Sequence, residues 1–434
     1  MKIALSSYSG LGAWWVLRLM AEGHKVDYFL SKPEYEDVLS GLIPKPKGVD
    51  IDYRRHIEGY GHPSYKGYDL SLFDFTGRPK QADASRAEVP TLGDGSFEEL
   101  LEVDREAGIK AMEDAGIEVP PYQMFENVSE AKAFIKKTDK RYVFKPYEGK
   151  DGSDKAVTYV AKDAEDMLKN IDKLFELAKH HHFLLQEFIK GIEASVMGYF
   201  NGTDFFQLTC TLECKKFMND DKGPNTGAAG NLVFAISDES MLYEKGLKKI
   251  IPILQMSGFK GMIDLNTIVT LDKAYGLEWT PRFGYIADST IAAMYGNGFG
   301  DMLHAIASGK TPEIKWTGPY GFGVTISIPP YPTEIRMAKA KDIAVEGINP
   351  EDIEQLKSIF LYDAMLAPNK KELVTSGNYG NIGAPNGIGD SIEQAVARCN
   401  ALIDRIHIPN MQYRTDIEKN VRKRYDFLEQ NGWL

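Results

Sequence analysis

Short apolar runs alternate with a helical pattern near the start of the chain. Lys2–Ser6, Val26–Leu30 and Tyr68–Phe75 predict strands. Trp14–Met20 has apolar residues at helical spacing and follows the turn Ser9-Gly10-Leu11-Gly12. Because strand–helix–strand alternation is typical of a parallel sheet covered by helices, we expect a doubly wound N-terminal α/β domain.

Helical and strand patterns mix in the middle of the chain. A long helix is predicted over Phe97–Ala115, and another over Asp238–Met256, after the turn residues Gly223–Gly227. Asn201-Gly202 separates two alternating runs, and Asp272-Lys273 separates two more. Each of these pairs therefore predicts a hairpin.

The last third of the chain changes pattern again. Strands are predicted at Gly323–Ile328 and Ile359–Met365, and helices over about residues 390–406 and 412–429. The whole pattern indicates a multidomain protein of mixed α/β and α+β class. We expect three domains, at residues 1–95, 96–314 (with a smaller subdomain at about 120–192) and 315–434.

Composition excludes several classes of protein. The 434 residues include 51 Lys and Arg against 62 Asp and Glu, a net charge of −11, which argues against a nucleic-acid groove or an anionic-membrane surface. No stretch approaches the roughly 20 apolar residues of a membrane span, and the start lacks the features of a secretory signal. Cys210, Cys214 and Cys399 form no metal or disulfide pattern. We expect a cytoplasmic protein with free thiols.

One candidate phosphate site follows a predicted strand that ends in Lys145. The next residues form a glycine-rich loop that includes Gly149, Gly152 and Ser153. Glycines let backbone N–H groups converge on phosphate oxygens, and the lysine supplies a point charge. An ordinary β-hairpin would show the same turn residues.

A candidate nucleoside site lies in Leu184–Ser195. An apolar strand there runs into the polar pair Gln186-Glu187 and a glycine turn, and Glu193 opens the next strand. A side-chain amide and backbone edges can hold adenine, and the Glu193 carboxylate can accept hydrogen bonds from ribose hydroxyls. A half-buried strand with a solvated glutamate would look the same.

Two carboxylates, Asp264 and Glu278, lie in the two strands of the second predicted hairpin. Placed opposite each other, they would repel unless a cation lay between them. Mg²⁺ typically takes one or two carboxylates together with nucleotide phosphates. Arg282 follows and could hold the oxygens of a transferring phosphoryl group. The competing interpretation is that both acids lie on a face of the sheet that is exposed to solvent.

Three strings together resemble the ATP-grasp superfamily and, within it, the glycinamide ribonucleotide synthetase family. Gln186-Glu-Phe-Ile-Lys-Gly-Ile-Glu-Ala-Ser195 precedes Gly223-Pro-Asn-Thr-Gly-Ala-Ala-Gly230, which is similar to the family string GPNTGGMG. Leu277-Glu-Trp-Thr-Pro-Arg-Phe-Gly284 resembles LEFNVRFG. The resemblance covers nearly the whole chain and implies an ATP-grasp fold between flanking N- and C-terminal domains.

The resemblance also implies a role for individual residues. ATP would contact Arg105, Lys145, Gly149, Gly152, Ser153, Gln186, the backbone N–H of Ile189, and Glu193. Mg²⁺ or Mn²⁺ would bind Asp264, Glu278 and Thr280, and Arg282 and Lys145 would be catalytic. The amine and amino-acid substrates would contact Ser9, Gly10, Gly12, Lys215, Lys216, Asn225, Thr226, Gly227, Gly230 and Arg282.

The implied activity is an ADP-forming carboxylate–amine ligase that works through an acyl phosphate, with glycine and phosphoribosylamine as substrates in purine biosynthesis. The chain departs from the family in three places. Ser7–Ala13 lacks the Arg and His of the family turn, Thr280 replaces an Asn, and Tyr285-Ile-Ala replaces an acidic string. A ligase for another amine, such as a nucleotide or modified nucleobase, and a non-catalytic nucleotide-binding protein remain alternatives. The oligomeric state stays open.

Overall fold

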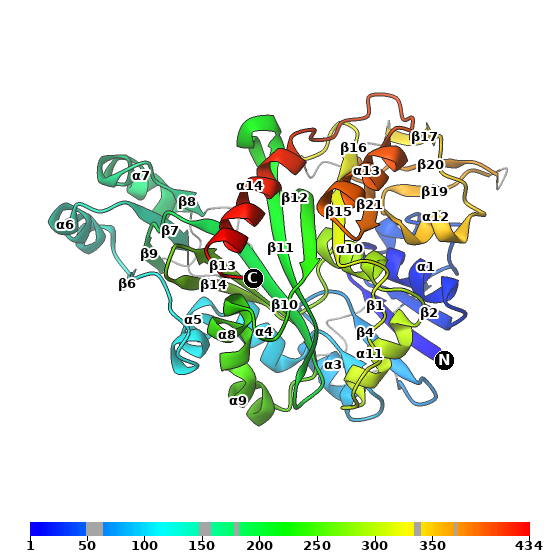
Figure 1. The fold of residues 1–434 in the computed structure, drawn as a ribbon, viewed down its shortest axis with the longest axis horizontal. Coiled ribbons are helices and arrows are strands. Elements are labelled where there is room, and N and C mark those ends of the chain that lie inside the picture. The colour runs from blue at the N-terminus through cyan, green and yellow to red at the C-terminus, as the bar shows by residue number, and fades with distance from the viewer. Residues whose placement is uncertain (49–63, 147–157, 178–181, 334–339, 369–370) are drawn as a thin grey trace.

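The computed structural model describes residues 1–48, 64–146, 158–177, 182–333, 340–368 and 371–434. Within these residues the chain forms four β-sheets, with helices packed around them (Figure 1). No helix in the described ranges is long and apolar enough to cross a membrane. All three cysteines are buried and free.

The N-terminal sheet has five parallel strands in the order β3-β2-β1-β4-β5. Their bounds are Lys2–Ser7 (β1), Lys25–Leu30 (β2), Lys47–Gly48 (β3), Leu70–Phe73 (β4) and Thr91–Leu92 (β5). Helix α1 (Ala13–Ala21) connects β1 to β2, and α3 (Pro79–Arg86) connects β4 to β5. The predicted parallel sheet is confirmed. Ser7 and Asp74 lie at the carboxyl ends of adjacent strands, where ligands gather in such sheets.

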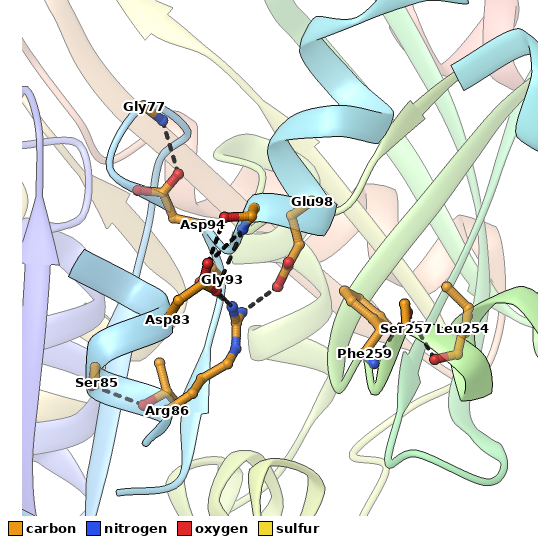
Figure 2. A network of polar contacts seen from close by, with 12 residues as sticks. Gly77, Asp83, Ser85, Arg86, Gly93, Asp94, Glu98, Leu254, Ser257 and Phe259 are labelled. Carbon is orange, nitrogen blue, oxygen red and sulfur yellow. Dashed lines mark hydrogen bonds and ion pairs between the residues drawn. The ribbon is translucent and has the colours of Figure 1, made fainter. Parts of the chain in front are cut away.

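A polar network ties this sheet to helix α4 (Ser96–Val103), as Figure 2 shows. The carboxylate of Asp94 accepts hydrogen bonds from the backbone N–H groups of Gly77 and Arg78, both at 2.8 Å. Arg86 forms an ion pair with Glu98 and donates to the backbone oxygen of Gly93 at 3.0 Å. The loop after β4, the loop after β5 and the start of α4 are therefore held together.

The long helix predicted over Phe97–Ala115 was wrong, because the chain breaks it at Asp104 into α4 and α5 (Arg105–Asp114). Asp104 has an extended backbone, and its carboxylate caps α5 by accepting from Ala107 N–H at 3.0 Å. Gly246 interrupts the other long helix without a side-chain cap, giving α8 (Met241–Lys245) and α9 (Leu247–Ser257).

A separate antiparallel sheet, in the order β6-β9-β7-β8, lies at one end of the molecule (Figure 1). Its strands are Tyr122–Phe125 (β6), Tyr142–Pro146 (β7), Tyr159–Val160 (β8) and Phe183–Glu187 (β9). Helices α6 (Val128–Thr138) and α7 (Ala164–Leu177) give it its own hydrophobic core, in which the rings of Phe144 and Phe183 stack at 4.8 Å.

The largest sheet has nine antiparallel strands in the order β14-β13-β10-β11-β12-β15-β21-β16, and β18 also pairs with β21. The strands are Ile192–Phe200 (β10), Phe205–Met218 (β11), Lys222–Ala235 (β12), Gly261–Val269 (β13), Ala274–Thr280 (β14), Tyr320–Val324 (β15), Ile326–Ser327 (β16), Ile359–Leu361 (β18) and Asn381–Gly389 (β21). Both predicted hairpins are confirmed. The segment Gly223–Gly227, expected as a turn, instead lies within β12.

Strands from the last third of the chain complete this sheet, since β15 pairs with β12. The strand predicted over Ile359–Met365 is two strands in different sheets, because Tyr362-Asp363 turns the chain between them. The second is β19 (Ala364–Leu366), in the small sheet β17-β20-β19. The remaining elements are η1 (Pro33–Tyr35), η3 (Asn219–Asp221), α10 (Ile286–Met294), α11 (Phe299–Ala307), β17 (Lys341–Val345), α12 (Ile353–Lys357), β20 (Leu373–Ser376), α13 (Ile392–Ile403) and α14 (Ile417–Gln430).

Candidate active site

One face of the nine-stranded sheet gathers charged and polar side chains from four neighbouring strands. Successive residues of a strand point to opposite faces, so residues two apart share a face. The register pairs Ser195 with Asn266, Asn266 with Glu278, and Asp264 with Thr280. This face, which we call the charged face, therefore carries Glu193 and Ser195 (β10), Glu213 and Lys215 (β11), Asp264 and Asn266 (β13), and Glu278 and Thr280 (β14).

The two predicted metal carboxylates share this face. We expected them to stand directly opposite each other, and this expectation was wrong. Asp264 faces Thr280, and Glu278 faces Asn266, which donates to Glu278 Oε1 at 3.4 Å. The register also shifts between Asn266 and Thr267. Asp264 and Glu278 are therefore diagonal neighbours, the first half-buried and the second exposed.

Negative charge is concentrated around a single ammonium group. Lys215 Nζ forms an ion pair with Glu193, and although burial opposes its charge, Glu193, Glu213 and Glu278 raise the pKa of Lys215. Burial raises the pKa of Asp264 well above its usual range, and the nearby Glu213 adds to the effect. The pKa of Glu213 is raised mainly by burial. Such a cluster favours binding of further positive charge.

The donors here are hard oxygens, which Mg²⁺ and Mn²⁺ prefer. No group of three His, Cys, Asp or Glu side chains in the described ranges is arranged to hold a metal by itself. Mg²⁺ in nucleotide sites takes one or two carboxylates and fills its remaining positions with phosphate oxygens and water. Asp264 and Glu278 fit that kind of site, in which the nucleotide supplies the other ligands.

Arg282 lies just after β14 and is held by helix α4. Its Nε and Nη2 donate to Oε1 of Glu102 at 3.1 and 2.9 Å, and Nη1 donates to the backbone oxygen of Phe283 at 3.1 Å. Burial alone would lower the pKa of Arg282, but Glu102 raises it. The guanidinium is therefore charged and fixed in orientation beside the carboxylate cluster.

The residues predicted to bind ATP lie on both sides of the junction between the four-stranded sheet and the nine-stranded sheet. Arg105 Nε donates to the backbone oxygen of Pro146 at 3.3 Å, which places the start of α5 against the strand that carries Lys145. Arg105 and Glu278 also line one small pocket. Gln186 is buried in β9, next to β7, and Ile189 is half-buried just beyond. Gly149, Gly152 and Ser153 lie outside the described residues.

The first βα turn, which includes Ser9, Gly10 and Gly12, packs against buried Asp74. Ser7 Oγ donates to Asp74 Oδ2 at 2.7 Å, and a Cβ on Gly12 would lie 2.1 Å from that oxygen. Only glycine allows so close an approach. Burial raises the pKa of Asp74 to about 7, although the nearby Arg282 opposes the shift. The turn therefore faces the same charged region as Arg282.

Tyrosines surround the other side of this turn. Tyr362 donates to the backbone oxygen of Ser9 at 3.4 Å, and the hydroxyls of Tyr35 and Tyr379 are hydrogen-bonded to each other. A Cβ on Gly10 would lie 3.2 Å from the Cβ of Tyr35, so Tyr35 also packs against this turn. Phenol groups and a carboxylate thus lie near this turn, which lacks the Arg and His expected from the resemblance to the glycinamide ribonucleotide synthetase family.

The candidate substrate residues of β11 and β12 separate into different surroundings. Lys216 pairs in register with Asn225, and Thr226 Oγ1 donates to the backbone oxygen of Lys215 at 2.8 Å. Asn225 and Gly227 are exposed. Lys215 Nζ lies among the carboxylates of the charged face. A Cβ on Gly230 would lie 2.3 Å from Ile417 Cδ1, so β12 packs closely against α14 at this point.

Sequence reasoning missed several residues that the fold brings to the site. Glu213 carried a usable signal, since it lies two residues before Lys215 in an alternating strand and so shares its face. Asp288 lies in α10, and burial raises its pKa to about 7 although it accepts from Gly284 N–H. Asp74 and Glu102 showed no local signal, because their partners Ser7 and Arg282 are distant in sequence.

Comparison with known proteins agrees with this geometry. Residues 108–287 match the family model of the phosphoribosylglycinamide synthetase ATP-grasp (A) domain. Phosphoribosylamine–glycine ligase from Neisseria meningitidis serogroup B is 24% identical over 349 residues, which cover 77% of this chain and 79% of that protein.

Two solved structures share the fold. The crystal structure of phosphoribosylamine–glycine ligase from Thermotoga maritima has a TM-score of 0.72 at 20% identity, over 96% of this chain and 100% of that one. The biotin carboxylase domain of Hydrogenobacter thermophilus 2-oxoglutarate carboxylase, solved with magnesium ADP and bicarbonate, has a TM-score of 0.64 at 14% identity, over 99% and 95%.

Residues 108–287, which include the charged face, therefore form an ATP-grasp domain, and the chain shares the overall fold of ATP-grasp ligases. Relatives named phosphoribosylamine–glycine ligase resemble this chain at low sequence identity, 24% and 27% in two of them. The expected superfamily and fold class are therefore confirmed.

Proposed function

We propose that the protein joins the carboxylate of an amino acid to an amine at the expense of ATP, with release of ADP and phosphate. Glycine and phosphoribosylamine are the first substrates to test, because they belong to the reaction for which the relatives are named. The observation that carries the proposal is the single sheet face on which Glu193, Lys215, Asp264 and Glu278 meet beside Arg282.

In this proposal the nucleotide lies between the small four-stranded sheet and the charged face. Gln186 and the backbone of Ile189 would hold adenine, and Glu193 would hold ribose. Lys145 and Arg105 would contact phosphates, since Arg105 already bonds the end of the strand that carries Lys145. A magnesium or manganese ion held by Asp264 and Glu278 would neutralise phosphate charge.

The reaction would proceed in two balanced steps. A carboxylate oxygen of the amino acid attacks the γ-phosphorus, the bond to the bridging oxygen breaks, and ADP leaves. The amine nitrogen then attacks the acyl carbon, phosphate leaves with its bonding electron pair, and the nitrogen loses a proton. Lys145 and Arg282 would stabilise the charge of the transferring phosphoryl group, and no side-chain nucleophile is required.

A phosphate-release assay across amino acids and candidate amines tests this proposal. We expect release that requires ATP, a divalent ion, one amino acid and one amine together, with an equal amount of amide product. Release that needs no amine, or no release with any pair, would contradict the proposed ligase and favour the non-catalytic alternative.

A second candidate keeps the chemistry and changes the amine. It is favoured by the turn Ser7–Gly12, which lies against Asp74 and close to Tyr362. A carboxylate and phenols suit hydroxyl, amino or aromatic groups better than a phosphate. If phosphoribosylamine fails in the assay, we expect a nucleoside- or nucleobase-bearing amine to replace it.

A further inference from the structure

A large cavity lies outside the candidate active site. Its volume is about 510 Å³. Its walls are formed by helices α1, α12 and α13, the end of α10, and strand β21. None of the candidate site residues that the structure describes lines it. Among the described residues, the lining has one carboxylate, that of Glu354, and four cationic side chains: Arg18, Lys357, Arg398 and Arg405.

Two of these cations have partners in the protein. Arg18 is buried, forms an ion pair with Glu22 at 3.0 Å, and donates to the backbone oxygens of Tyr295 and Gly296. Lys357 donates to Glu354 at 2.8 Å and to Asn297 at 3.0 Å. Because their charges are balanced locally, these two side chains shape the cavity but add little to its electrostatic potential.

Arg398 and Arg405 differ from the first pair. Across the described ranges, neither guanidinium has a carboxylate within 4.0 Å, although Arg398 Nη1 donates to the backbone oxygen of Ile388 at 2.6 Å. Both residues are exposed. In a chain with a net charge of −11, two such guanidiniums in one concave site form a local reversal of charge.

Helix ends explain only part of this arrangement. Helices α10, α12 and α13 end at or near the cavity, and cations near a helix C-terminus are favourable because about half a negative charge resides there. Lys357 and Arg405 stand at such ends. Arg398 lies inside α13, more than a turn before its last residue, so the helix dipole does not account for it.

We propose that this cavity is a second binding site, separate from the ATP site, for a small molecule that carries a phosphate group. The planar guanidinium of arginine matches phosphate oxygens in geometry. Two guanidiniums carry the two positive charges that balance a phosphate dianion, whereas a single carboxylate would leave one positive charge unbalanced. The volume lies within the range of small-molecule sites, so there is room for more than the phosphate itself.

Two helices connect this cavity to the candidate active site. Helix α1 starts after Gly12 at the βα turn, and Arg18 in the same helix lines the cavity. Helix α10 carries Asp288 near its start, and Tyr295 just after its end lines the cavity. Each path is roughly 10 Å long at 1.5 Å per residue. An occupant would therefore touch elements that also position the active site.

Isothermal titration calorimetry with inorganic phosphate and with glycerol 3-phosphate tests the proposal. The full chain is first saturated with a non-hydrolysable ATP analogue and magnesium, so that the ATP site is filled. The variant is R398A/R405A, and the charge-matched control is K136A/K137A, which removes two exposed lysines from the distant helix α6. Melting temperatures check that each variant folds.

We expect the wild type and the control to bind one glycerol 3-phosphate, and the arginine variant to bind it at least about tenfold more weakly, or ~1.4 kcal/mol. R405A alone should show part of the loss. The proposal would be overturned by no binding in the wild type, by equal binding in the arginine variant, or by citrate binding as tightly as the phosphate compounds.

Discussion

Glu278 is the exposed carboxylate of the charged face, and Asn266 donates a hydrogen bond to it. We expect Glu278→Gln to lower turnover at least about 100-fold, because a neutral amide loses the charge that binds a metal–nucleotide complex, a loss of ~2.7 kcal/mol in transition-state stabilisation. The melting temperature should change little, since exposed substitutions are worth about ±0.5 kcal/mol. Steady-state kinetics and thermal melts measure both. Glu239→Gln, also exposed, is the control; wild-type turnover in Glu278→Gln would remove Glu278 from the site.

Lys215 is the ammonium group that the carboxylates surround. We expect Lys215→Ala to raise the KM for ATP about tenfold, ~1.4 kcal/mol, because Glu193, Glu213 and Glu278 would then repel one another and the nucleotide phosphates. The KM for the amine should change far less. Lys248→Ala, which removes an exposed lysine of α9 that is ion-paired with Glu244, is the matched control. A rise confined to the KM of the amine would return Lys215 to the substrate group.

Three buried carboxyls make stability depend on pH. Burial raises the pKa of Asp74 and Asp288 to about 7 and that of Asp94 to about 8. Above about pH 4 an unfolded carboxyl has released its proton while these still hold theirs, so the free energy of unfolding should fall as pH rises toward 8. Urea denaturation at about pH 5.5 and 8 measures this fall, which Asp94→Asn should reduce. Equal or greater stability at the higher pH would contradict the assignment.

The break between α4 and α5 depends on one side chain. Asp104 caps α5, and Arg105 at its first position bonds the end of β7. We expect Asp104→Ala to cost about 1 kcal/mol of stability and to raise the KM for ATP, because the start of α5 would be less well fixed. Denaturant titration and kinetics test both effects. Asp104→Asn keeps a capping oxygen and should retain most of the stability, so an equal loss in both variants would argue against the cap.

Hairpins were easier to predict than helix limits, for a local reason. Asn201-Gly202 and Asp272-Lys273 lie between runs of alternating polarity, and both hairpins formed there. The helices that broke at Asp104 and Gly246 kept helical spacing on both sides of the break. A cap needs a backbone turn that residue spacing does not reveal. The pattern of polar and apolar residues did not reveal the strand register either. Asp264 was expected opposite Glu278, but it pairs with Thr280.

Long-range contacts decide which residues share the charged face. Period-two alternation could have linked Glu213 to Lys215, but Arg282 and Glu102 are 180 positions apart and meet only through the fold. Likewise, Ser7 meets Asp74 across adjacent parallel strands. The superfamily was predictable because its strings are contiguous in sequence. The surroundings of the first βα turn were not, because the tyrosines that line it come from distant parts of the chain.

Strands from the last third of the chain complete the nine-stranded sheet that carries the charged face, so this sheet is built from distant parts of the molecule. The most direct test of the ligase assignment follows ¹⁸O from the carboxylate of glycine, or of the amino acid that supports phosphate release, by mass spectrometry of the products. If an acyl phosphate forms, one carboxylate oxygen must leave with phosphorus, so we expect one ¹⁸O in each phosphate released and one in the amide. Phosphate without ¹⁸O, or AMP and pyrophosphate in place of ADP and phosphate, would contradict it.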